Sequence, residues 1–315
     1  MAASDWWSVD RRRMAIDELL LIPGLVTGWT ARDLQRGAER GTVERIARGA
    51  YVDRREWLRL RDDERALLRA LAHARQHPGA VLSHTSAALL HGLPVAIPSQ
   101  LPEVLRRRSQ HDLGGSAVRA RSTVAPPDAV EVDGVAVVPI ERTVVDLAAT
   151  LPFREALAPL DGYLGRGGSR DALHDLLGGL RIRGARRAEA AIEHADGGAA
   201  NGGESLSRGT VLELGFPRPE VQMAVEGSVH KTDLGWPEFL LRGELDGFQK
   251  YVDPRYANGR SPARIVFAEK RREDEIRLLT GHRFVRWTFD DALRTHPLRR
   301  ALLRAGLPQR QRRTR

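Results

Sequence analysis

The sequence predicts a multidomain α/β protein. Its 315 residues are enough for two or three domains of the usual ~100–150 residues, and its hydrophobic content of 42% is enough for ordinary globular cores. Helical and β-like runs alternate along the chain, and the glycine-rich stretch 196–203 is typical of a flexible linker. We expect a winged-helix domain, a middle α/β domain, a helical linker, a C-terminal α/β domain and a basic tail, at 1–60, 61–155, 156–198, 199–305 and 306–315.

The composition excludes several classes of protein. The chain has no cysteine, which excludes disulfides, thiolate zinc sites and a cysteine nucleophile. No apolar targeting segment follows the start, and no apolar run approaches the ~20 residues that a membrane span needs. We therefore expect a cytoplasmic protein with no membrane partner.

The net charge of +9 favours a polyanionic partner, but the charge is unevenly distributed. The segment 297–315 holds seven arginines and no acidic residue, so the rest of the chain carries only +2, from 9 − 7. This tail either contacts phosphates without sequence preference or is simply a solvated, disordered end.

The first 60 residues predict a small helical unit that ends in a strand. A short apolar helix covers 14–21, and Thr30 with Asp33 forms a capping box for a second helix. The segment 42–47 is expected to form a further short helix with Val43 and Ile46 inward, followed by a strand at 48–52. This order of elements is that of a winged helix-turn-helix.

Four arginines lie on or beside the segment expected to be the recognition helix, and they are the candidate nucleic-acid-binding residues: Arg36, Arg40, Arg45 and Arg48. The alternative is a small packing domain that makes no DNA contact, since residues 1–60 hold 11 arginines against 9 acids.

The middle region combines helices with short β-like pieces. Helices are expected at 62–76, 87–91 and from 141 to 147, with β-like segments at 117–121 and 135–140. Ser83, His84 and His91 invite comparison with a hydrolase, but no Gly-x-Ser-x-Gly motif accompanies them. We interpret these side chains as helix-capping and packing residues.

The C-terminal region predicts a mixed sheet flanked by helices. The expected order is a helix at 204–214, strands at 220–226, 229–234, 239–247 and 264–268, a helix at 269–279, a strand at 283–288 and a short helix from 290.

Alternation in the third of these strands groups its charged side chains. Glu244 and Asp246 share one face with Arg242, and the intervening residues are apolar or glycine. The hairpin partner brings Asp233 near them. Converging carboxylates suit Mg²⁺ or Mn²⁺, which can polarise a phosphoryl oxygen and lower the pKa of an attacking water. The alternative is a surface hairpin with scattered acids.

The three lysines of the chain fall within one 40-residue stretch around these acids, at Lys231, Lys250 and Lys270, and arginine is the basic residue everywhere else. A compact ammonium can orient a water or offset phosphate charge where a planar guanidinium fits poorly. Chance clustering is the alternative explanation.

Several of these motifs together resemble a known family. The matching segments are 202–205, Thr-Asp-Leu-Gly-Trp-Pro-Glu at 232–238, Glu-Leu-Asp-Gly at 244–247, Lys-Tyr at 250–251, Glu-Lys-Arg-Arg-Glu at 269–273 and Arg-Trp-Thr at 286–288. They resemble the Vsr-like endonuclease domains of the restriction-endonuclease-like, PD-(D/E)xK superfamily.

The resemblance implies a fold and a set of roles. Asp233 and Glu244 would be metal ligands, and Glu204 would bind the metal through water. The sequence departs from the pattern at the lysine of the (D/E)xK motif, where it has Asp246. Lys250 or Lys270 would then take the place of that lysine.

The first 150 residues resemble the AbiEi antitoxins of type IV toxin–antitoxin systems. The matching segments are Arg-Gly-Ala-Tyr-Val at 48–52, Ser-His-Thr-Ser-Ala-Ala-Leu-Leu-His-Gly at 83–92 and Glu-Arg-Thr-Val-Val-Asp-Leu at 141–147. The resemblance implies DNA binding, autoregulation and a cognate toxin as partner, although nothing in the sequence shows that such a toxin exists.

Together these features predict a DNA-binding protein with a Vsr-like, divalent-metal-dependent DNA endonuclease domain. Two alternatives stay open. The first is a non-enzymatic antitoxin or transcriptional regulator whose nuclease-like domain only binds DNA, which Asp246 favours and the Asp233–Glu244 pair disfavours. The second is an RNA-directed nuclease.

Overall fold

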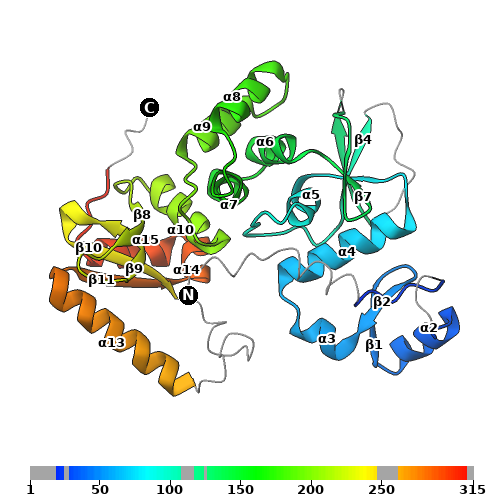
Figure 1. Ribbon diagram of the computed structural model, residues 1–315, viewed down its shortest axis with the longest axis horizontal. Helices are drawn as coiled ribbons and strands as arrows, with labels where there is room; N and C mark the ends of the chain where they lie inside the picture. The colour runs from blue at the N-terminus through cyan, green and yellow to red at the C-terminus, as the bar shows by residue number, and fades with distance from the viewer. Residues whose placement is uncertain (1–18, 25–27, 108–116, 124–125, 247–261, 311–315) are drawn as a thin grey trace. The chain divides into compact units, whose positions relative to one another are not determined.

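The computed structural model describes residues 19–24, 28–107, 117–123, 126–246 and 262–310. The chain folds into two compact units (Figure 1). The first comprises Met1–Leu151 and Ser169–Ile192, and the second comprises Pro152–Gly168 and Glu193–Arg315. Both units combine helices with β-sheet, which confirms the expected α/β class.

The first unit begins with a helix followed by a hairpin. Helix α2 (Ala31–Glu39) starts at the predicted Thr30–Asp33 capping box, in which each side chain accepts a hydrogen bond from the other residue's backbone N–H. Strands β1 (Val43–Ala47) and β2 (Ala50–Asp53) then pair antiparallel. Leu21, which precedes α2, forms an isolated antiparallel bridge to Tyr51 of β2, so the segment before α2 borders the hairpin at one residue pair.

The predicted helix at 42–47 is wrong, because these residues form strand β1. The spacing of Val43 and Ile46 suits a helix, but six residues are too few for that spacing to outweigh strand pairing. Gly49, with a φ of +71°, provides the left-handed backbone that a tight hairpin turn needs. The helix that directly precedes the hairpin is therefore α2.

The rest of the first unit surrounds a five-stranded mixed sheet in the order β5-β4-β3-β7-β6. The strands are β3 (Val81–Leu82), β4 (Glu103–Arg107), β5 (Arg119–Thr123), β6 (Val130–Val132) and β7 (Val135–Val137). The helices are α3 (Arg54–Arg59), α4 (Asp62–Gln76), α5 (His84–Leu90), α6 (Ile140–Thr150), α8 (Arg170–Gly179) and α9 (Ala185–His194), of which α9 ends just beyond the unit. One apolar cluster joins Val52 of the hairpin to Leu68 of α4 and Leu82 of β3, so residues on both sides of position 60 share a core.

The second unit contains a four-stranded sheet in the order β11-β10-β9-β8, in which only β10 and β11 are parallel. Its strands are β8 (Glu220–Ala224), β9 (Lys231–Trp236), β10 (Leu241–Asp246) and β11 (Arg283–Thr288), and a 3₁₀ turn η2 (Pro237–Phe239) joins β9 to β10. Its helices are α7 (Phe153–Leu164), α10 (Gly202–Glu213), α13 (Pro262–Thr280), α14 (Phe289–Arg294) and α15 (His296–Arg304).

This sheet has two differently covered faces. Its apolar face packs in one core cluster with α10, α14 and α15, through residues such as Leu234, Val285 and Leu298. Helix α13 lies along the other face (Figure 1), where Ile276 is fully buried and Arg272 contacts β10. The two faces follow the alternation of side chains along β10.

The predicted strand at 264–268 is wrong, because these residues lie in the first half of α13. The run Arg-Ile-Val-Phe-Ala has β-branched and aromatic residues that favour a strand locally. It is continuous with the strongly helical 269–279, and a proline at the first position suits a helix start, so helix propagation determines the structure.

The segment expected to be a helical linker is divided between the units. Helix α7 belongs to the second unit, where its Asp161 forms a buried ion pair with Arg208 of α10. The glycine-rich stretch that follows is tied to the same unit, because the Asp196 N–H donates to Asp161 and Asn201 caps α10.

Candidate functional site

Asp233 and Glu244 are neighbours on adjacent strands. Strands β9 and β10 are antiparallel, and their paired residues end at Leu234 opposite Gly243, so Asp233 and Glu244 are the next residues on the two strands. The Leu245 N–H donates to Asp233 Oδ2 at 2.7 Å, which fixes that carboxylate against β10. The structure thus brings together the two residues predicted to be metal ligands.

The Glu244 carboxylate is buried and carries two ion pairs. Arg272 of α13 donates to Oε1 at 2.6 Å, and Arg286 of β11 lies 3.1 Å from Oε2. Burial raises the pKa of Glu244, Arg272 opposes that rise, and the charge of Asp233 adds to it. The negative charge of this buried carboxylate therefore needs compensation, and the two guanidinium groups provide it.

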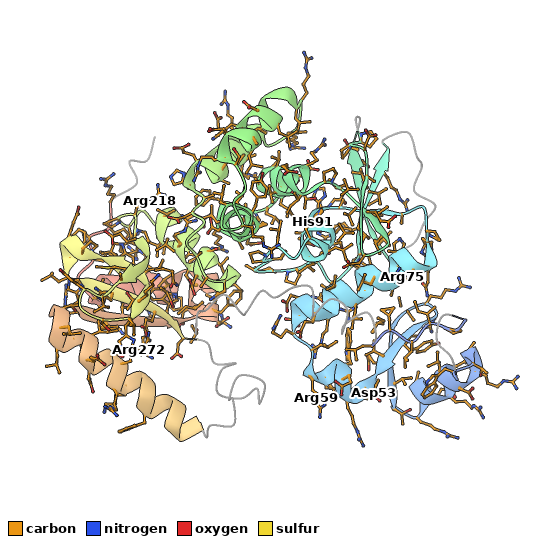
Figure 2. All side chains as sticks on the ribbon, in the orientation of Figure 1. Asp53, Arg59, Arg75, His91, Arg218 and Arg272 are labelled. Carbon is orange, nitrogen blue, oxygen red and sulfur yellow. The ribbon has the colours of Figure 1, made fainter. Side chains whose placement is uncertain are left out.

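The two arginines belong to a wider ion-pair network on this face. Arg286 lies directly beside Glu244 in the parallel register of β10 and β11, and it also contacts Glu273 at 2.9 Å. Arg277, one turn after Glu273 on α13, pairs with Glu273 at 2.5 Å and stacks over Phe284. Figure 2 labels Arg272 between α13 and the strands, where its side chain enters this network.

Sequence reasoning missed the roles of Arg272 and Arg286. One signal could have found the first of them, because Arg272 and Ile276 are four residues apart and therefore share a helix face. Ile276 is an apolar residue in a strongly charged helix, so its side marks the face that packs on the sheet.

The structure gives no contact between Glu244 and the described residues that were considered for the lysine of the (D/E)xK motif. Asp246 is the last residue of β10, half-buried and level with Thr288 of β11. Lys270 is exposed on α13, and Lys231 is exposed at the start of β9. Lys250 lies outside the described residues. The expected substitution of Lys250 or Lys270 for the missing lysine stays a prediction.

Glu204 is held by other partners. It lies at the start of α10, is 4% exposed, and accepts hydrogen bonds from the Ala200 N–H at 2.9 Å, Asn201 Nδ2 at 2.6 Å and Gln222 Nε2 at 3.0 Å. These bonds order the start of the helix. Its expected role as an outer metal residue stays a prediction.

The donor atoms of Asp233 and Glu244 have the chemistry that Mg²⁺ or Mn²⁺ requires, since both ions prefer carboxylate oxygens. In the part of the chain that the structure describes, no three His, Asp or Glu side chains are grouped so that they could hold a metal ion. Both Glu244 oxygens face guanidinium nitrogens. The residues fit a divalent ion once the guanidinium at one of the two Glu244 oxygens turns away.

The four arginines predicted to contact nucleic acid are all exposed. Arg36 lies on α2 and pairs with Asp33 at 2.6 Å, and Arg40 caps the end of that helix. Arg45 lies on β1, and Arg48 lies in the hairpin turn. Arg45 and Arg48 face solvent as expected, although they belong to a β-hairpin and not to a helix.

The residues interpreted as capping and packing groups lie in the first unit. His91 Nε2 is 2.7 Å from the Val138 carbonyl oxygen, and Ser83 immediately precedes α5 but makes no side-chain capping bond. His84 is 7% exposed and has a φ of +48°, and burial lowers its pKa to about 4. Ser83 Oγ and His84 Nδ1 are buried and have no hydrogen-bond partner within the described structure.

Comparisons with known proteins identify no family. No protein-family model and no curated protein matches the chain. Among solved structures, the chain is similar to the RV2827C protein from Mycobacterium tuberculosis, with 16% identity and a TM-score of 0.31 over 63% of this chain and 80% of that one. A likeness at this level carries no argument about fold or function. In the described residues, no helix has the length and apolarity needed to cross a membrane.

Proposed function

We propose that the protein binds duplex DNA through the unit formed by α2 and the β1–β2 hairpin, arranged as a winged helix. Support comes from the order of elements, in which a capped helix precedes a hairpin whose second strand forms an isolated bridge to Leu21. In such an arrangement α2 is the helix that enters the major groove, and the hairpin is the wing beside it.

The observation that carries the proposal is the exposed arginine set of this unit. Arg36 and Arg40 lie towards the C-terminal end of α2, and Arg45 and Arg48 lie on the hairpin. Guanidinium groups form bidentate hydrogen bonds with phosphates and with guanine edges. Among the described residues, Arg40, Arg45 and Arg48 have no ion-pair partner, so a phosphate would not have to displace a carboxylate there.

A salt titration of the full chain on a labelled duplex tests this proposal. Binding through phosphates releases counterions, so the logarithm of the affinity should fall linearly with the logarithm of the salt concentration, with a slope of about −0.9 for each phosphate contacted. A salt-independent affinity would contradict the proposal.

The second candidate function is metal-dependent cleavage of a phosphodiester by the second unit. The observation that favours it is the proximity of Asp233 and Glu244 on the adjacent strands β9 and β10, where the charge of Asp233 raises the pKa of Glu244. A divalent ion held there would polarise a phosphoryl oxygen and lower the pKa of an attacking water. Asp233 and Glu244 would hold the ion, and nearby cations would offset charge in the transition state.

Incubation with supercoiled plasmid, with and without Mg²⁺ or Mn²⁺, tests this second candidate. Nicking or linearisation that requires the metal and disappears in Asp233→Asn supports it, and an RNA substrate run in parallel separates the RNA-directed alternative. No cleavage with either metal would favour the non-enzymatic antitoxin or transcriptional-regulator alternative, in which the second unit only binds DNA and a toxin is the partner to look for.

A further inference from the structure

We propose that Arg272 and Arg286 act as place-holders for the divalent ion, so that metal can bind Glu244 only by displacing Arg272. This inference rests on the second candidate function, and it assigns the regulation of that centre to two residues that stand in the matching segments but received no role from the resemblance.

The first step of the argument is the position of the two guanidinium groups. They approach different oxygens of Glu244, Arg272 at 2.6 Å from Oε1 and Arg286 at 3.1 Å from Oε2. A divalent ion bound to Glu244 needs at least one of these oxygens at ~2.0–2.2 Å, which leaves no room for a guanidinium hydrogen bond along the same direction. Metal and arginine therefore compete for the same carboxylate.

The second step concerns charge. Glu244 is 6% exposed and has Asp233 beside it, so a second negative charge adds to its desolvation. A buried carboxylate in that setting has to be compensated by a cation or protonated. The two arginines provide this compensation, and a bound divalent ion would make it redundant.

The third step distinguishes the two arginines. Arg286 has a second partner in Glu273 at 2.9 Å and lies on the edge strand β11, where the parallel register places it beside Glu244. Arg272 projects from α13, its side chain is 31% exposed, and it also donates a longer hydrogen bond of 3.3 Å to the Lys231 carbonyl oxygen. Arg272 is thus the one that can swing into solvent, where it becomes available to a phosphate.

Mn²⁺ titration of the full-length protein tests the proposal, with unbound Mn²⁺ counted by electron paramagnetic resonance. Arg272→Gln should bind Mn²⁺ about tenfold more tightly than the unmodified protein, the effect of removing one competing charge-assisted hydrogen bond. Arg277→Gln is the matched control, because it removes an arginine of the same helix that pairs with Glu273 and not with Glu244. It should leave the Mn²⁺ affinity unchanged.

A second variant guards against a folding defect. Arg272→Lys keeps the positive charge, so its Mn²⁺ affinity should stay within about threefold of the unmodified protein, and circular dichroism should show native secondary structure for all variants at the temperature of the titration. Arg272→Lys binding as tightly as Arg272→Gln would overturn the place-holder role.

The remaining outcomes separate the two proposals. If Glu244→Gln removes Mn²⁺ binding but Arg272→Gln matches the unmodified protein, the competition is overturned and the metal centre stands. If Glu244→Gln binds Mn²⁺ as well as the unmodified protein does, or if none of the proteins binds Mn²⁺, both the competition and the metal centre are overturned.

Discussion

Arg208 and Asp161 form an ion pair in which each side chain is only 1% exposed, with Arg208 Nη2 at 2.8 and 2.9 Å from the two carboxylate oxygens. Arg208 also donates to the His194 carbonyl oxygen at 2.6 Å, and Asp161 accepts from the Asp196 N–H. The pair thus joins α7, α10 and the segment before α10 within the second unit. Charges this deeply buried are costly unless each is compensated.

We predict that Arg208→Met strongly destabilises the second unit, by about 3–5 kcal/mol, because it leaves Asp161 buried without its cation. The double variant Arg208→Met/Asp161→Leu should lose less than Arg208→Met alone, since neither charge then remains. Urea unfolding of the full chain measures both changes. Arg294→Gln, which removes an exposed ion pair of the same unit, is the control and should leave the midpoint unchanged. Equal losses in the single and double variants would contradict the prediction.

The buried His84 predicts a pH dependence of stability in the first unit. Burial lowers the pKa of His84 to about 4, and the charges of Arg121 and Arg142 act in the same direction while Glu103 opposes them. The unfolded chain, with a histidine pKa near 6.5, binds the proton more readily than the folded one. The stability is therefore full above pH 6.5 and falls as the pH decreases towards 4, by up to about 3 kcal/mol.

The variant His84→Asn isolates this effect. Asparagine does not titrate in this range, and it tolerates the left-handed backbone that His84 adopts at a φ of +48°. Urea unfolding at pH 7.5 and pH 4.5 should show a smaller loss of stability on acidification in His84→Asn than in the unmodified protein. The same loss in both proteins would mean that His84 is not the group responsible.

Gly243 lies where two tryptophans approach the backbone of β10. A Cβ at this position would come within 2.5 Å of the Trp287 ring and 3.1 Å of the Trp236 ring. Both rings belong to the buried core of the second unit, so they cannot move freely. We predict that Gly243→Ala destabilises the protein by about 1–3 kcal/mol through overpacking. Thermal unfolding provides the measurement, and Gly178→Ala, where a Cβ would meet nothing within 4 Å, is the control that should not be destabilised.

Much of the fold could be predicted from local sequence. The helix at 62–76 and the strand at 283–288 have the predicted bounds, because each has one clear hydrophobic period over its whole length. The errors at 42–47 and 264–268 fall on five or six residues whose pattern fits two structures. At 42–47 the structure is set by pairing with the neighbouring strand, and at 264–268 it is set by the helix that follows. A pattern of five or six residues contains neither piece of information.

The candidate site was predictable to a similar degree. Alternation and the order of the strands were enough to expect Asp233 near Glu244, because the two residues lie on neighbouring strands of one hairpin. Arg272 reaches Glu244 from a helix 28 residues further along the chain, so its contact depends on how α13 packs on the sheet. The spacing of Arg272 and Ile276 marks the face of α13 that packs on the sheet, but it does not say which residue of the sheet Arg272 meets.

The hairpin arginines allow a test of DNA binding that separates phosphate contacts from general charge. If Arg45 and Arg48 each contact one phosphate, Arg45→Gln and Arg48→Gln should each weaken duplex binding at low salt. Each should also reduce the magnitude of the salt slope by about 0.9. Both arginines are exposed, so these variants should fold normally. Fluorescence anisotropy of a labelled duplex, measured at several salt concentrations, gives both quantities.

Arg181→Gln is the matched control, because it removes an exposed arginine of the same unit that lies between α8 and α9. It lowers the net charge by the same amount, so it should weaken binding only slightly and leave the slope unchanged. If Arg181→Gln changes the slope as much as Arg45→Gln does, the effect comes from net charge and not from the hairpin. If neither hairpin variant changes the slope, the DNA contacts have to be sought elsewhere in the chain, and the winged-helix proposal fails.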